Sequence, residues 1–113
     1  MTLRAPRRRS PPQALRLVID RRVPACIVRG HYSLATMDTW LVAVDNRRPL
    51  DNWRILAMAE EIRRTGRVPG SFGLGTYEGR TYLLDGRHRR EAVRMSGVGT
   101  VYAVIAWKRC TLG

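Results

Sequence analysis

The residues best suited to chemistry lie between positions 85 and 91, where the sequence reads Asp-Gly-Arg-His-Arg-Arg-Glu. Three guanidinium groups and one imidazole in four consecutive positions favour an anion, because both groups donate charge-assisted hydrogen bonds to phosphate oxygens. A helix that begins here also directs unpaired backbone N–H groups toward such an anion. The stretch therefore predicts a phosphate-binding site at the start of a helix.

The neighbouring residues predict the elements that position this site. Residues 82–84 form an apolar run too short for a helix, which favours a strand. Asp85 is the predicted helix cap, and Gly86 can adopt backbone angles that other residues avoid. Gly97 is a typical residue at a helix end. We therefore expect a strand, a turn and a helix that ends at Gly97.

Helical spacing directs part of the cation cluster toward the protein body. Ala92, Val93 and Met95 form the apolar side of the predicted helix. His88 and Arg89 lie on that same side, one turn earlier. The remaining charged residues of the helix fall on other sides, namely Arg87, Arg90, Glu91 and Arg94. Cations at a helix N-terminus oppose its dipole, and a bound anion would reverse that penalty. The alternative is that Asp85 neutralises the cluster and nothing binds.

The charge of the whole chain points to anionic partners. The formal net charge is +12, and Lys108 is the one lysine among 21 basic residues. Such a charge favours nucleic acid, nucleotides or an acidic protein surface. The sequence has no apolar run that could span a membrane and no signal peptide, so we expect a cytoplasmic protein without membrane association. Cys26 and Cys110 lack metal-ligand spacing, which predicts free thiols and no metal site.

The N-terminal residues differ in composition from the rest of the chain. Residues 1–13 contain three prolines and the cluster Arg7, Arg8 and Arg9, which predicts a disordered basic arm before a single domain over residues 14–113. The arm can bind a phosphate backbone or act only as a solubilising leader. Arg47 and Arg48 precede a predicted helix, where they can reach a ligand or nucleic acid, or remain solvated loop charges.

The remaining pattern predicts an α+β fold with a small mixed sheet and a few helices. We expect a hairpin of strands 15–19 and 23–28, a loop over 30–33, and further strands at 40–44, 72–77, 81–84 and 101–107. Asp51 or Asn52 is expected to cap a helix that runs to about Thr65 and is ended by Gly66. In the helix, Ile55, Met58, Ala59 and Ile62 form the buried stripe and Arg54 lies outside. The tryptophans Trp40, Trp53 and Trp107 are expected to pack in or around the core.

The stretch from Leu84 to Ala92 resembles the DG-x-HR-x-x-A signature of the ParB/sulfiredoxin superfamily. The order of the surrounding elements also fits: a polar segment at 46–50, an amphipathic helix, a hairpin into the signature, and a following strand. The resemblance covers roughly residues 40–107. It implies a compact ParB/sulfiredoxin-like domain with a nucleotide phosphate pocket at residues 85–91. By that resemblance, Gly86, His88 and Arg89 would contact the phosphates, with Arg87 nearby, and the ligand would be CTP or ATP with Mg²⁺.

The chain also departs from its relatives. Sulfiredoxins have a reactive cysteine immediately before the His-Arg pair, where this chain has Arg87, so repair of sulfinic acid is not expected. The region after Trp107 is too short for the helix-turn-helix and dimerisation domains of partition proteins. The chain looks more like the short, stand-alone ParB-like proteins of phages and mobile elements.

Three functions fit these features. The first is a DNA-binding regulatory or accessory protein that also binds a nucleotide. The second is a small Mg²⁺-dependent enzyme of ParB-like type, such as an NTPase, a kinase or a nuclease, although the sequence identifies no catalytic residues. The third is a phage-encoded protein that binds a host protein, with the fold as a scaffold.

Overall fold

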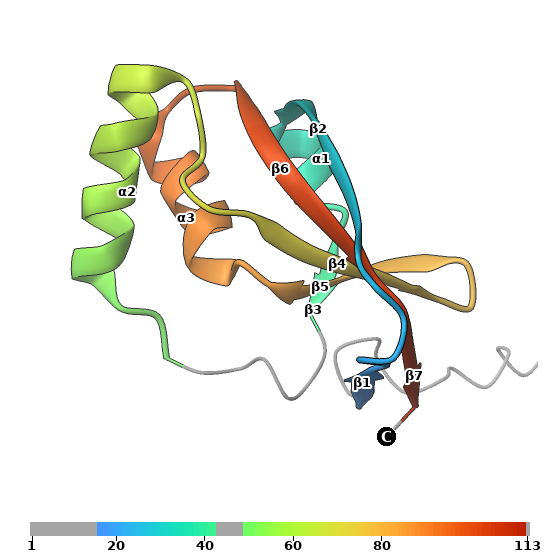
Figure 1. The fold of residues 1–113 in the computed structure, drawn as a ribbon. Helices are drawn as coiled ribbons and strands as arrows, with labels where there is room; N and C mark the ends of the chain where they lie inside the picture. The colour runs from blue at the N-terminus through green and yellow to red at the C-terminus, as the bar shows by residue number, and fades with distance from the viewer. Residues whose placement is uncertain (1–15, 43–48, 113) are drawn as a thin grey trace, which may run out of the picture.

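A five-stranded mixed sheet forms the centre of the protein (Figure 1). The computed structural model describes residues 16–42 and 49–112. In spatial order the strands are β2 (Cys26–Ser33), β6 (Thr100–Lys108), β4 (Phe72–Tyr77), β5 (Arg80–Asp85) and β3 (Leu41–Val42). The pairs β4–β6 and β3–β5 are parallel, and the other two pairs are antiparallel. The predicted α+β class with a mixed sheet is confirmed.

Helices α2 (Asn52–Thr65) and α3 (Arg87–Ser96) lie side by side on one face of the sheet (Figure 1). The Asp51 carboxylate caps α2 by accepting hydrogen bonds from two backbone N–H groups of its first turn. Gly66 ends the helix in the left-handed conformation that glycine adopts most easily. The bounds predicted for this helix are confirmed, because both of its ends are specified by local residues.

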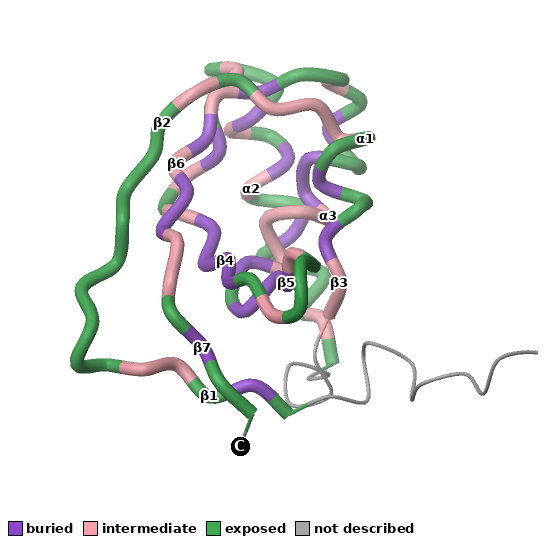
Figure 2. Tube along the Cα trace, turned by 90° about the vertical axis from the view of Figure 1, so that its right-hand side faces the viewer, coloured by how far each residue is buried: buried purple, intermediate pink, exposed green. Residues whose placement is uncertain are grey.

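The main core lies between these two helices and the sheet. Its largest fully buried members come from α1 (Leu34–Met37), α2 and several strands, namely Phe72, Met37, Ile62, Leu74, Leu83 and Ile105. Figure 2 shows the buried segments of β4, β5 and β6 beside the helices, whereas β2 is exposed along most of its length. Of the residues predicted for the apolar side of α3, Ala92 and Val93 are fully buried. Met95 is 46% exposed, so its predicted burial was wrong.

The N-terminal strand does not form the predicted hairpin. β1 (Leu17–Ile19) pairs with β7 (Cys110–Leu112) in a separate antiparallel ribbon, and β2 pairs with β6 instead. Residues 30–33, predicted as a loop, belong to β2, because β6 supplies their hydrogen-bond partners. The ribbon packs a second apolar cluster, in which Leu17 and Cys110 contact Tyr82 and Leu84 of β5.

A short helix, α1 (Leu34–Met37), follows β2, in a segment for which the sequence favoured no element. The expected strand over 40–44 is represented by β3, which covers residues 41–42 within the described part of the chain. The predicted basic arm with Arg7, Arg8 and Arg9, and the loop residues Arg47 and Arg48, lie outside the described residues. No helix in the described ranges is long and apolar enough to cross a membrane.

Candidate phosphate site

The predicted signature connects the end of β5 to the start of α3 through a single glycine. Gly86 has a φ of 120° and is the N-cap of α3. A Cβ at this position would lie 2.6 Å from the ring of Phe72, so the turn has no room for a side chain. The prediction that Asp85 caps the helix was wrong, because no side chain caps α3. The first turn of α3 therefore keeps backbone N–H groups directed toward the adjacent space.

His88 ties the starts of the two helices together. Its Nε2 accepts a hydrogen bond from the backbone N–H of Asp51 across 2.8 Å. With Nε2 used as an acceptor, Nδ1 is the ring nitrogen that remains for a second hydrogen bond. Because Asp51 is the N-cap of α2, this bond places the N-termini of α2 and α3 beside each other. The positive ends of two helix dipoles thus lie near one site.

Arg89 is held in a fixed direction by the loop before β4. Its Nε donates a hydrogen bond to the carbonyl oxygen of Pro69 across 2.8 Å. Gly70 has a φ of 73°, and a Cβ there would lie 2.6 Å from the Arg89 guanidinium, so glycine is needed for this close approach. The predicted inward direction of His88 and Arg89 is confirmed by these contacts.

Arg90, predicted on another side of the helix than His88 and Arg89, contacts the end of α1. Its Nη1 donates to the carbonyl oxygens of Met37 and Trp40, at 3.0 and 2.9 Å. Burial lowers the pKa of Arg90 from its usual value. Its guanidinium therefore joins α3 to the end of α1 and stabilises the fold.

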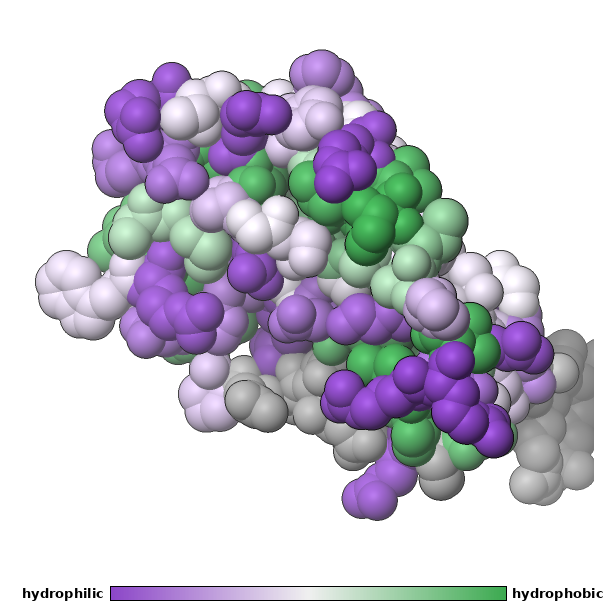
Figure 3. Space-filling view, viewed as in Figure 1, coloured by the Kyte–Doolittle hydropathy of each residue, from purple (hydrophilic) through white to green (hydrophobic). Residues whose placement is uncertain are grey.

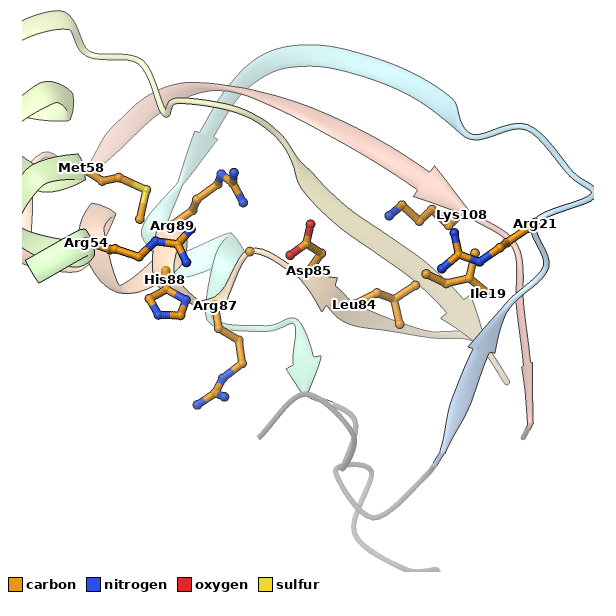
Figure 4. Close-up of a pocket in the computed structure, with 11 residues that line it drawn as sticks. Ile19, Arg21, Arg54, Met58, Leu84, Asp85, Arg87, His88, Arg89 and Lys108 are labelled. Carbon is orange, nitrogen blue, oxygen red and sulfur yellow. The ribbon is translucent and has the colours of Figure 1, made fainter. Parts of the chain in front are cut away.

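Cations from four segments surround one pocket of about 470 Å³ next to Gly86 (Figure 4). The pocket is lined by Arg87, His88 and Arg89 of α3, Arg54 of α2, Lys108 of β6 and Arg21 of the β1–β2 turn, together with Asp85, Met58, Ile19 and Leu84. In Figure 4, Arg54, His88 and Arg89 lie on one side of Asp85, and Lys108 and Arg21 lie on the other. Figure 3 shows the same division as hydrophilic side chains over the start of α2 and over the β1–β2 turn. The predicted site residues are therefore part of a larger cationic cluster.

Three of these cations were not predicted as site residues. Arg54 is exposed on α2, as expected, and from the first turn of that helix it also lines the pocket. Arg54 follows the predicted cap Asp51 by three residues, and this spacing could have predicted that Arg54 lies in the first turn of α2, beside the site. Arg21 and Lys108 carry no local signal, because long-range packing of β1 and β6 brings them to the site.

Asp85 is the acidic residue among those that line the pocket, and it is exposed. Within the described residues its carboxylate makes no hydrogen bond and no ion pair. Gly73 beneath it leaves space for Lys108, whose Nζ would lie 3.2 Å from a Cβ on Gly73. The alternative in which Asp85 pairs with the arginine cluster is therefore not observed.

A second group of carboxylates forms ion pairs at the far end of α3. Asp38 accepts two hydrogen bonds from the guanidinium of Arg94, at 2.6 and 3.0 Å, and Glu91 pairs with the same arginine. The hydrogen bonds from Arg94 hold the pKa of Asp38 below its ordinary value. This network fastens α3 to the residue after α1.

The remaining candidate groups are placed away from the pocket. Cys26 is exposed and Cys110 is buried, and both are free thiols, as predicted. Burial raises the pKa of Cys110, which disfavours its reactive thiolate. Trp40 is buried and meets Phe72 edge to face, and Trp107 packs against the core. Trp53 was expected to pack in the same way, but it is 82% exposed.

Comparison with known proteins supports the fold. No family model and no curated protein matches the chain. Among solved structures, the crystal structure of sulfiredoxin from Arabidopsis thaliana is similar, with a TM-score of 0.54 and 20% sequence identity. The match covers 73% of this chain and 88% of that chain. The chain therefore has a sulfiredoxin-like fold, as the signature predicted.

Proposed function

We propose that this protein binds the phosphate groups of a nucleoside polyphosphate in the pocket at the start of α3. The observation that carries the proposal is the convergence of cations from separate elements around one pocket, with Arg54, Arg89 and Lys108 from α2, α3 and β6. Guanidinium and ammonium groups repel one another when they gather without a counterion. An anion that joins them removes this repulsion and gains charge-assisted hydrogen bonds.

The backbone supports the same ligand. Helix α3 has ten residues and no side-chain cap, so its first turn can donate N–H groups to an anion. The Asp51–His88 bond brings the start of α2 to the same place. The pocket volume of about 470 Å³ falls in the range of pockets that hold small organic ligands and exceeds the size of one phosphate.

CTP or ATP with Mg²⁺ fits the side chains of this pocket. Among the described residues, no three His, Cys, Asp or Glu side chains gather as a metal site. Mg²⁺ commonly binds to phosphates with only one or two protein carboxylates. Asp85 is such a carboxylate, since it faces the pocket and has no partner among the described residues. Mg²⁺ would supply charge neutralisation on the phosphates, and Asp85 would orient it.

Nucleic acid is the second ligand class that we propose. With this ligand, the protein would be a DNA-binding regulatory or accessory protein of ParB-like fold. The net charge of +12 supports it. Of the predicted contact residues, Arg7, Arg8, Arg9, Arg47 and Arg48 remain proposals. A second candidate function is a small Mg²⁺-dependent NTPase, kinase or nuclease. Phosphoryl transfer needs a metal ion and cations that hold the phosphates, and Asp85 would hold the metal beside the cations of the pocket.

A titration of the full chain tests the phosphate site. Inorganic tripolyphosphate, ATP and CTP, each with Mg²⁺, are added to the wild type and to Arg54→Ala. The matched control is Arg64→Ala, because Arg64 lies near the other end of the same helix and its side chain is 72% exposed. We expect saturable binding that weakens about tenfold in Arg54→Ala and less than twofold in Arg64→Ala.

A DNA duplex, titrated at two salt concentrations, tests the second ligand class. Binding through phosphate contacts must weaken steeply as salt rises, because counterions are released on association. Release of phosphate from bound ATP or CTP would favour the enzyme. Absence of binding to all of these ligands would reject both proposals and leave a protein partner, such as a host protein, as the remaining function.

A further inference from the structure

The pocket has two chemically different ends. Arg54, His88 and Arg89 gather with Met58 at the start of α3, whereas Ile19 of β1 and Leu84 of β5 line the opposite end (Figure 4). Leu84 is 8% exposed and Ile19 is partly buried, and both belong to the apolar cluster beneath the β1–β7 ribbon. A ligand made only of phosphate would leave this apolar surface in contact with water.

The β1–β2 turn adds a guanidinium to the apolar end. Asp20 pairs with Arg22, which donates to both carboxylate oxygens at 3.0 and 3.2 Å. The Asp20 carboxylate is thus occupied by Arg22, and Arg21 lines the pocket. In Figure 4 the guanidinium of Arg21 lies above Ile19 and points toward the pocket centre. Guanidinium planes stack on nucleobases, and aliphatic side chains can cover the opposite face of a base.

We propose that the β1–β7 end of the pocket binds the nucleobase, with Ile19 and Leu84 as its apolar support and Arg21 stacked on it. This assignment rests on the proposed phosphate site and gives the ligand a direction, with its phosphates at the start of α3. Lys108 and Asp85 then lie between the two ends, where they face the ribose and the first phosphate. The contacts at the base are apolar and stacking contacts, so they bind ATP and CTP with similar affinity.

Three probes separate the two ends of the ligand: ATP, CTP and inorganic tripolyphosphate, each with Mg²⁺ and the full chain. In the wild type, both nucleotides are expected to bind about tenfold more tightly than tripolyphosphate. Ile19→Ser is expected to weaken the nucleotides about fivefold and to leave tripolyphosphate within twofold. Val18→Ser is the matched control, because Val18 is the neighbouring residue of β1 and is 51% exposed. It is expected to change none of the three affinities.

A second pair of variants keeps the test valid if Ile19→Ser fails to fold. Arg21→Ala is expected to weaken both nucleotides about threefold. Arg22→Ala, at the next position of the same turn, with its side chain 90% exposed, is the control and should change them less than Arg21→Ala. Equal affinities for all three probes would overturn the base assignment and leave the phosphate site intact. Nucleotide affinities that do not change in Arg21→Ala would have the same consequence. Failure of tripolyphosphate itself to bind would reject the phosphate site and with it the assignment.

Discussion

The imidazole of His88 accepts a hydrogen bond from the backbone N–H of Asp51 across 2.8 Å, which joins the first turns of α2 and α3. The two residues are 37 positions apart in sequence. The bond connects the residue that caps α2 with a residue that lines the pocket. The pocket is thus built at the junction of two helix N-termini, and its geometry depends on this contact.

Removing the imidazole tests that junction. His88→Ala is expected to lower the free energy of unfolding by about 1 kcal/mol, because the N–H of Asp51 loses its acceptor. Denaturant unfolding of the full chain measures the change. His31→Ala is the control, since His31 is exposed and meets Tyr102 edge to face, and we expect at most about 0.5 kcal/mol. Equal losses in the two variants would mean that the bond to Asp51 adds no stability.

Gly86 is expected to tolerate no side chain. Gly86→Ala combines a positive φ of 120° with a contact of 2.6 Å to the Phe72 ring. We expect a loss of about 3 kcal/mol from backbone strain and steric overlap. Gly79→Ala has a φ of 73° but no atom within 4 Å of the added Cβ, so its cost should be nearer 1 kcal/mol. Thermal unfolding of both variants separates strain from overlap, and identical melting temperatures would argue against the overlap.

Arg90 is expected to stabilise the folded protein. Arg90→Ala removes the donor to the carbonyl oxygens of Met37 and Trp40, which should cost about 2–3 kcal/mol because the donor is charged and partly buried. Denaturant unfolding measures this loss against Arg64→Ala, an exposed arginine of α2, for which little change is expected. If the two arginine variants unfold alike, Arg90 does not fasten α3 to α1.

The Asp38–Arg94 pair gives the fold a specific dependence on acid. The pKa of Asp38 is lowered in the folded protein by the hydrogen bonds from Arg94. A lowered pKa means that the pair stabilises the fold fully at pH values well above the ordinary value of 3.8, and that this contribution is lost as the pH falls through the folded pKa. Asp38→Asn should therefore be less stable than the wild type at pH 7, and the difference should shrink toward pH 3. A difference that stays constant over this range would contradict the assignment.

The elements predicted correctly are those whose ends are specified nearby. Asp51 and Gly66 determine the bounds of α2, and Gly97 ends α3. The hairpin predicted for β1 and β2 failed because β1 pairs with β7, where Leu17 is opposite Leu112. A pairing across most of the chain leaves no local pattern, whereas a turn such as residues 20–22 occurs with or without a hairpin.

In the candidate site, too, the features specified by nearby residues were predicted and those that depend on long-range packing were not. Helical spacing was sufficient to direct His88 and Arg89 inward, because both lie on one helix with Ala92 and Val93. Asp85 was predicted as the helix cap from its residue type, but the positive φ of Gly86 makes the glycine the cap. Arg21 and Lys108 reach the pocket only through the packing of the sheet, so no spacing within the sequence could have joined them to residues 86–89.

The most direct test of the phosphate site follows the backbone amides of the isotope-labelled full chain by NMR while tripolyphosphate is added. We expect saturable shifts at the amides of Gly86, Arg87, His88 and Arg89, where the uncapped turn of α3 meets the pocket. Arg54→Ala should move the midpoint of these shifts to about tenfold higher tripolyphosphate. Shifts confined to residues 1–13 or spread over all basic surfaces, with no saturation at residues 86–89, would contradict the account.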